Sequence, residues 1–203
     1  MPVLHVEYRL CPEYPLPAAV EDTSTIYRAL LFHQNISSSQ LIFMGDSSGG
    51  GLVLLTIQSL IADQLPVPRG AIVISPWTDL SASGESHQRN RHTDVIINSD
   101  NSDWMVAQIL GPNHTELSAN SSIFSPLFGS FEKFPPMYIN VGTAEVLEDD
   151  AKRVFLKAKE AGVDVTLEEG LHMMHTYPTF FLFFPEAKNT LNNIKEWTEK
   201  LLF

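Results

Sequence analysis

The stretch Leu41–Leu52, with the sequence L-I-F-M-G-D-S-S-G-G-G-L, indicates the fold more strongly than any other part of the chain. It places the pattern G-x-S-x-G, centred on Ser47, between an apolar run typical of a buried strand and an apolar run typical of a helix. Glycines at these positions permit a sharp, strained turn that lifts the Ser47 hydroxyl clear of the end of the strand. The helix begins directly behind the serine, where its first N–H groups can stabilise a developing negative charge. The pattern therefore predicts a nucleophilic serine.

Two other interpretations of this segment conflict with the sequence. A phosphate-binding loop needs a lysine after the glycines or the pattern G-x-G-x-x-G, and the chain has neither. Trypsin-like peptidases also contain Gly-Asp-Ser, but they are all-β proteins with the chain order His, Asp, Ser. Helix-rich patterning and late histidines contradict that order here.

Short β-rich runs alternate with longer helical patterns along the chain, which predicts an α/β fold with a mostly parallel sheet and helices on both faces. A run of Ser, Asn, Asp and His over residues 81–130 reads as an excursion from the sheet, either a cap or lid or a solvated loop. The expected strands are Val3–Tyr8, Leu41–Met44, Ala71–Ser75, Met137–Val141 and Val163–Glu168. The expected helices are Pro17–His33, Ser48–Ala62, Ser102–Leu110, Glu148–Ala161 and Pro185–Leu202.

Length and composition fit a single domain over residues 1–203. Thirteen Lys and Arg against 24 Asp and Glu give a formal charge of −11, which makes nucleic acid an improbable partner. No apolar run approaches the roughly 20 residues that span a bilayer. The single cysteine, Cys11, excludes an internal disulfide, and no histidines are spaced as zinc ligands. No basic n-region with an apolar stretch behind it opens the chain, so no secretory signal is predicted.

A nucleophilic serine needs a histidine base and a carboxylate that orients it, and these follow the elbow serine in the order acid, then histidine. The strand Met137–Val141 leads to four candidate acids, of which three lie in a first helical turn where dipole compensation explains them. Glu145 is the one that needs another explanation. The three acids of the helical turn are Glu148, Asp149 and Asp150.

After the strand Val163–Glu168, two histidines compete for the role of base, His172 and His175.

With these motifs assembled, the chain resembles the hormone-sensitive lipase-like, or arylacetamide deacetylase-like, branch of the α/β-hydrolases. The resemblance runs nearly from end to end and implies an α/β-hydrolase fold. It is carried by Glu7–Glu13 with Pro17–Asp22 (the Y-R-L-A-P-E…P-A-A-x-x-D stretch, with Cys11 for the usual Ala), Gly45–Gly50 (the G-D-S-A-G-G elbow, with Ser48 for Ala), Ile74–Trp77, and Pro135–Gly142 followed by Glu145–Asp150.

The resemblance implies that Ser47 is the nucleophile and Glu145 the triad acid, at a position where most relatives carry Asp. For the base, the family has G-M-x-H followed by an aromatic residue, and this sequence departs from that spacing by two residues. Aligning Met173–Tyr177 restores M-x-H-x-aromatic, which favours His175 over His172. We expect the run Phe180–Phe184 to be core rather than an acyl pocket.

The family also has an H-G-G-G oxyanion motif before its Y-R-L-A-P-E stretch, and this sequence starts after that point. The resemblance implies that the first strands and part of the cap are missing, with a gap between the strands Val3–Tyr8 and Leu41–Met44. Either those strands pair directly after a shift of about 4.8 Å, or the fold is incomplete. The N–H of Ser48 stays as one oxyanion donor, whereas each lost donor costs roughly 10²–10³ in turnover and would impair activity.

The implied function is a serine carboxylic-ester hydrolase for small to medium acyl esters, working through a Ser-His-Glu triad and an acyl-enzyme without a cofactor. The alternatives are a catalytically inactive truncated homologue and a relative that binds a small ligand, although such binders lack the catalytic histidine. A prolyl-oligopeptidase-like peptidase shares the fold but usually has an aromatic residue where Asp46 stands. The cytoplasm is the default location for the chain as written, and the sequence leaves the oligomeric state open.

Overall fold

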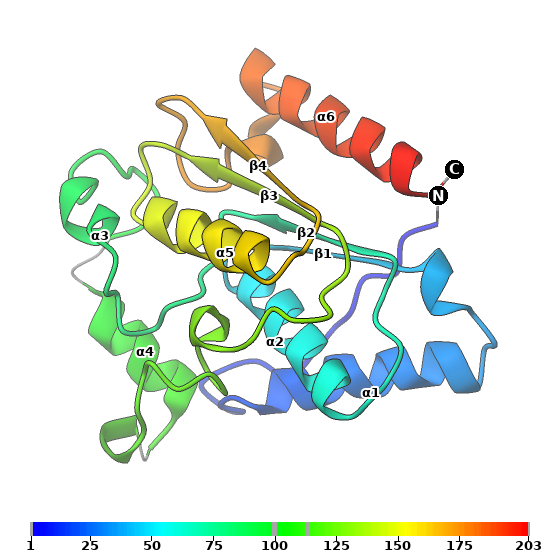
Figure 1. Cartoon of the computed structure of the whole chain (residues 1–203). Coiled ribbons are helices and arrows are strands. Elements are labelled where there is room, and N and C mark those ends of the chain that lie inside the picture. The colour runs from blue at the N-terminus through cyan, green and yellow to red at the C-terminus, as the bar shows by residue number, and fades with distance from the viewer. Residues whose placement is uncertain (1, 99–100, 113, 203) are drawn as a thin grey trace.

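The computed structural model describes residues 2–98, 101–112 and 114–202, and its frame is a parallel sheet of four strands (Figure 1). The strands lie side by side in chain order: β1 (Ile42–Asp46), β2 (Gly70–Ile74), β3 (Met137–Gly142) and β4 (Val165–Gly170). Every residue of β2 and β3 is buried, as expected for central strands of a parallel sheet with both faces covered. The predicted α/β architecture is confirmed.

Four long helices cover the sheet: α1 (Ala18–Phe32), α2 (Ser48–Ala62), α5 (Glu148–Glu160) and α6 (Pro185–Leu202). Because successive strands step across the sheet in one direction, right-handed crossovers place α2 and α5 on the same face. Figure 1 shows both of them there, with α6 on the opposite side. The predicted helix boundaries agree with these within one residue at each end.

The core has two parts, one on each face of the sheet. The larger part joins α2 and α5 to β2 and β3, and fully buried side chains such as Leu54, Ile57 and Ile139 each contribute about 1.5–3 kcal/mol. The smaller part packs Ile194 and Trp197 of α6 against the other face. The sheet is thus held between two apolar layers, and loops project from the ends of its strands.

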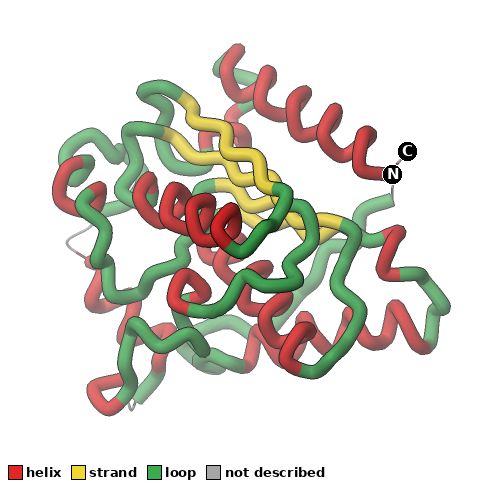
Figure 2. Tube along the Cα trace, viewed as in Figure 1, coloured by secondary structure: helices red, strands yellow, loops and turns green. Residues whose placement is uncertain are grey.

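Between β2 and β3 the chain runs through residues 81–130, whose described part contains helices and loops but no strand (Figure 2). Its residues 99, 100 and 113 lie outside the described part. The helical pieces are α3 (Ser86–Arg89), α4 (Ser102–Leu110), η3 (His114–Glu116) and η4 (Pro126–Phe128); two further short turns, η1 (Ser38–Gln40) and η5 (Tyr177–Phe180), lie elsewhere. No helix in the described ranges is both long and apolar enough to cross a bilayer.

Two expectations from the sequence are wrong. Val3–Tyr8 is not a strand: residues 2–10 are irregular and mostly exposed, and within the described residues β1 pairs only with β2. Val3–Tyr8 therefore does not pair directly with the elbow strand, because this segment lies outside the described sheet and forms no ladder with it. The run Phe180–Phe184 is not core either, since Leu182 and Phe183 are 79% and 75% exposed.

Candidate active site

Ser47 lies at the carboxyl end of β1, in a backbone conformation that few residues adopt. Its φ of 54° and ψ of −123° turn the chain sharply from the strand into α2. Hydrogen bonds to the neighbouring β2 chain hold this turn: Ser47 N–H donates to Ile74 O at 2.9 Å, and Trp77 N–H donates to Ser47 O at 2.9 Å. A Cβ at Gly51 would lie 2.2 Å from the carbonyl oxygen of Trp77, so glycine is required for this close approach. The turn leaves Ser47 half-buried.

Glu145 lies in the turn that joins β3 to α5, and its side chain is completely buried. A buried carboxylate is stable only when it is paired or hydrogen-bonded, and this one has three donors. Its Oε1 accepts from the hydroxyl of Ser75 at 2.7 Å and from the N–H of Gly142 at 2.6 Å. Its Oε2 lies 2.5 Å from Nδ1 of His175. The carboxylate is therefore fixed in one orientation with one oxygen committed to the imidazole.

His175 lies on the loop after β4, and this loop is bonded to the turn that carries Glu145. Thr143 N–H donates to Gly170 O at 2.9 Å, and Ala144 N–H donates to Met173 O at 3.1 Å. The two chains approach so closely that a Cβ at Gly142 would lie 2.2 Å from Met173 O. The loop thus brings the imidazole, which is only 4% exposed, over the ends of the neighbouring strands.

The three side chains Ser47, His175 and Glu145 form one continuous hydrogen-bonded relay. His175 Nε2 lies 2.9 Å from Ser47 Oγ while Nδ1 faces the carboxylate. An ionised carboxylate only accepts hydrogen bonds, so Nδ1 carries the proton, and Nε2 of the neutral ring is free to accept the proton of the serine hydroxyl. This arrangement can move a proton away from Ser47 while stabilising the imidazolium that results.

The competing candidates lie outside this relay. His172 is exposed, and its backbone N–H, rather than its ring, bonds to Thr143 Oγ1 at 2.7 Å. Asp150 is buried but accepts from the backbone N–H groups of residues 78 and 79. Ser48, the expected oxyanion donor, is the first residue of α2, where backbone N–H groups have no acceptor within the helix.

The other two acids of the α5 first turn, Glu148 and Asp149, belong to a charged cluster. Burial raises the pKa of Glu148, but hydrogen bonds from Lys152 and Arg89 outweigh it and leave that pKa below its ordinary value. Burial also raises the pKa of Asp149, but hydrogen bonds from Ser86 N–H and Arg89 outweigh this effect, so that this pKa is lowered as well. Both carboxyls are thus kept ionised and stabilise the beginning of α5.

Sequence reasoning missed the residues that hold the acid turn in place. Asn90, buried on the excursion, donates from Nδ2 to Glu145 O at 2.8 Å and to Glu148 Oε2 at 3.1 Å. Asp94 accepts from the N–H of Val146 at 2.9 Å. Ser75 could have been found, because it directly follows a buried strand whose end lies beside the elbow, whereas nothing in the pattern around Asn90 or Asp94 marks a long-range contact.

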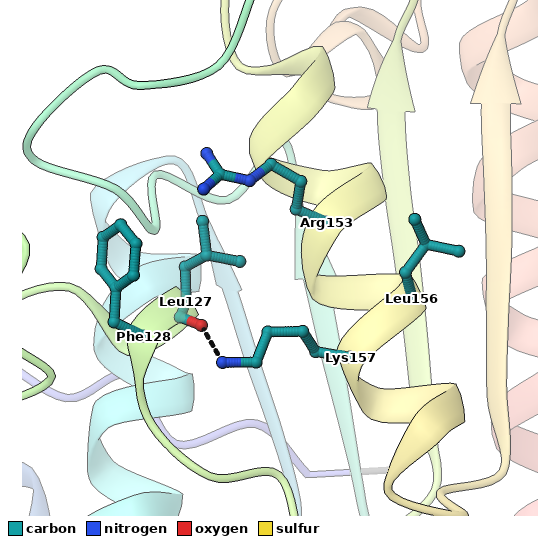
Figure 3. Close-up of a pocket in the computed structure, with 5 residues that line it drawn as sticks. All are labelled: Leu127, Phe128, Arg153, Leu156 and Lys157. Atoms are coloured by element: carbon teal, nitrogen blue, oxygen red, sulfur yellow. Dashed lines mark hydrogen bonds between the residues drawn. The ribbon is translucent and has the colours of Figure 1, made fainter.

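A separate pocket of about 200 Å³ lies between α5 and η4, and no residue of the relay lines it (Figure 3). Arg153 and Lys157 point from α5 toward Leu127 and Phe128. Both cations already have partners: Lys157 Nζ donates to Leu127 O, and Arg153 pairs with Asp79. Both cations that line the pocket are therefore already engaged within the protein.

Comparison with known proteins identifies the fold family. A family profile described as alpha/beta hydrolase fold matches residues 1–179. The chain belongs to the α/β-hydrolase fold family. Among curated relatives of this α/β-hydrolase, an acetyl-hydrolase of Streptomyces hygroscopicus is 35% identical over 93% of this chain and 62% of its own length. An esterase of Acinetobacter venetianus is 34% identical over 99% of this chain and 65% of its own length.

Solved structures point to the same branch of the α/β-hydrolases. An esterase from the bacterial hormone-sensitive lipase family superposes with a TM-score of 0.91 at 36% identity, covering 97% of this chain and 65% of the other. A hormone-sensitive lipase from a metagenome library gives a TM-score of 0.88 at 32% identity, over 95% of this chain and 65% of the other. The resemblance to the hormone-sensitive lipase-like branch is thereby confirmed. The chain spans a little less than two thirds of the length of these relatives.

Proposed function

We propose that this α/β-hydrolase is a serine carboxylic-ester hydrolase in which Ser47 is the nucleophile, His175 the general base and acid, and Glu145 the carboxylate that orients the imidazole. The observation that carries the proposal is the relay itself, in which His175 lies 2.9 Å from Ser47 Oγ and 2.5 Å from Glu145 Oε2. Relatives named esterase and acetyl-hydrolase support an ester as the substrate. Small to medium acyl esters are the expected class.

The reaction follows from the proton positions in the relay. Ser47 Oγ attacks the ester carbonyl carbon and its proton passes to His175 Nε2, giving a tetrahedral oxyanion. Collapse of this intermediate expels the alcohol, which takes the proton from Nε2 and leaves an acyl group on Ser47. Water then attacks the acyl carbon, gives one proton to Nε2, and a second collapse releases the carboxylic acid and returns the proton to Ser47. Glu145 stays ionised and stabilises the imidazolium in both halves.

The oxyanion needs donors near the Ser47 hydroxyl, and the start of α2 supplies one. We assign this role to the N–H of Ser48, at the positive end of the α2 dipole. A single donor contributes roughly 10²–10³ in turnover, so the rate depends strongly on whether further donors are present.

The second candidate function, a small-ligand binder without catalysis, is disfavoured by one observation. A binder has no need of a buried carboxylate and imidazole aligned on a serine hydroxyl, and such a buried polar arrangement is costly unless it is used.

Hydrolysis of p-nitrophenyl butyrate tests the proposal, with Ser47→Ala as the comparison. We expect turnover by the unaltered chain and a loss of at least about 10³-fold in Ser47→Ala. Labelling of Ser47 by a fluorophosphonate, located by peptide mass spectrometry, separates the nucleophile from background hydrolysis. Equal turnover in both proteins, or a folded chain with neither turnover nor labelling, contradicts the proposal.

A further inference from the structure

One connected set of hydrogen bonds takes a polar side chain from at or after the carboxyl end of each of the four parallel strands, and only three of these side chains belong to the proposed triad. Ser47 follows β1, Glu145 follows β3 and His175 follows β4. The fourth, Ser75, follows β2, the strand that lies between the nucleophile strand and the acid strand. Because His175 must reach from Glu145 across to Ser47, its ring and its loop pass over the end of β2, where Ser75 lies.

The Ser75 hydroxyl bonds to both the acid and the loop that carries the base. It donates to Glu145 Oε1 at 2.7 Å and accepts from the backbone N–H of Thr176, the residue after His175, at 3.0 Å. A hydroxyl has one proton to donate, and here that proton is committed to the carboxylate. Ser75 therefore joins the acid itself to the loop that carries the base, beside the separate bond from the His172 N–H to Thr143 Oγ1.

The position of Ser75 is itself tightly held. The residue is fully buried, its N–H donates to Asn140 O on β3 at 2.7 Å, and its φ is 47°. A non-glycine residue at positive φ is uncommon and persists where the surrounding structure determines it. The backbone that carries this hydroxyl is thus fixed by its bond to β3 and by the packing around it.

We propose that Ser75 is a positioning residue for the hydrolytic reaction: its hydroxyl fixes Glu145 Oε1, leaves Oε2 to His175, and anchors the His175 loop at Thr176. This inference rests on the proposed function for its catalytic consequence, but the geometry it describes belongs to the resting protein. The Gly142 N–H also holds Oε1, so removal of the Ser75 hydroxyl weakens the orientation of Glu145 without abolishing it.

The test compares Ser75→Ala with Ser24→Ala. Ser24 is a matched control because it is also a buried serine, on α1, and its Oγ has no hydrogen-bond partner within the described part of the chain. Three quantities are measured for each protein: kcat and KM on p-nitrophenyl butyrate, the rate of Ser47 labelling by a fluorophosphonate, and the downfield imidazole N–H proton resonance of His175. A purely structural role for Ser75 would alter stability but not this resonance.

For Ser75→Ala we expect kcat and the labelling rate to fall by about 10- to 100-fold, the size expected for one hydrogen bond to a charged group, with KM within about twofold. The imidazole resonance should shift or broaden, and Ser24→Ala should match the unaltered chain in all three. If Ser75→Ala does not fold, Ser75→Cys, which keeps the size and a weak donor, serves with the same readouts.

Unchanged kcat, labelling rate and imidazole resonance in a folded Ser75 variant would overturn the inference. If the unaltered chain neither turns over nor labels, the proposed function fails instead. In that case the imidazole resonance still decides the inference, because it reports the His175–Glu145 contact without any substrate.

Discussion

His175 Nε2 lies 2.9 Å from Ser47 Oγ, although 128 positions separate the two residues in the chain. The contact exists because β1 and β4 are parallel members of one sheet and their carboxyl ends meet at the same edge. The loop after β4 then crosses the ends of β3 and β2 to reach the nucleophile.

The choice between the two histidines can be tested by substituting each one. We expect His175→Gln to lower kcat for p-nitrophenyl butyrate by at least about 10³-fold, because no other base contacts Ser47 Oγ in the described structure. His172→Asn should keep kcat within about twofold, since its ring is exposed and Asn tolerates its φ of 59°. The reverse result would assign the base to His172.

The role of Glu145 predicts a large effect from a nearly isosteric change. Glu145→Gln keeps the shape but replaces the accepting Oε2 with an amide that can donate, which favours the wrong tautomer of His175. We expect kcat to fall by roughly 10³–10⁴-fold, as for the equivalent change in other triads. Asp149→Asn is the control, because Asp149 pairs with Arg89 outside the relay and should leave kcat nearly unchanged. Similar losses in both variants would mean that the acid turn as a whole, rather than Glu145, is responsible.

The elbow geometry predicts opposite effects for two glycines two positions apart. Gly51→Ala should destabilise the fold by about 2 kcal/mol or more, because its Cβ would lie 2.2 Å from Trp77 O and one of the two chains must move. Gly49→Ala has open space around the new methyl and lies in α2, where Ala is favoured over Gly by about 0.5–1 kcal/mol. Urea unfolding measures both, and a stable Gly51→Ala variant would show that the elbow does not require this close approach.

The excursion over residues 81–130 contains a segment that braces the acid turn. Asn90→Ala removes the Nδ2 donor to Glu145 O and should lower kcat and the free energy of unfolding together, the latter by about 1–3 kcal/mol. Gln88→Ala, at an exposed position of α3 just before Asn90, should leave kcat unchanged and the free energy of unfolding within about 0.5 kcal/mol. A stable Asn90→Ala protein in which only KM changes would instead favour a lid that contacts substrate.

The lowered pKa of Glu148 makes stability depend on pH in a stated direction. A carboxyl whose pKa is lower in the folded than in the unfolded protein contributes stability above its ordinary pKa of 4.5, and that contribution is lost as pH falls through the folded-state pKa. At pH 7, Glu148→Gln should therefore lower the free energy of unfolding in urea by about 1–2 kcal/mol relative to the unaltered chain. This difference in free energy should shrink below about pH 4. Glu160→Gln, at an exposed position of the same helix, is the control and should change the free energy of unfolding at pH 7 by less than about 0.5 kcal/mol.

Much of this protein could be predicted from local sequence. The helices over Ser48–Ala62 and Pro185–Leu202 follow from apolar periodicity, and the elbow follows from G-x-S-x-G between a strand and a helix. These features depend on neighbouring residues alone. The strand predicted over Val3–Tyr8 was wrong for a related reason: a strand needs a partner to bond to, and alternation along one segment cannot reveal whether a partner lies beside it.

The order of residues along the chain was enough to indicate the kind of chemistry, because a serine on an elbow with acids and histidines downstream suits acyl transfer. Which side chains meet became evident only from the folded arrangement. It places His175 rather than His172 against Ser47, and it brings Ser75 and Asn90 to the acid turn. The physical reason is that hydrogen bonds of about 3 Å between distant residues depend on strand register, loop path and packing together, and none of these is encoded in the spacing of residues along the chain.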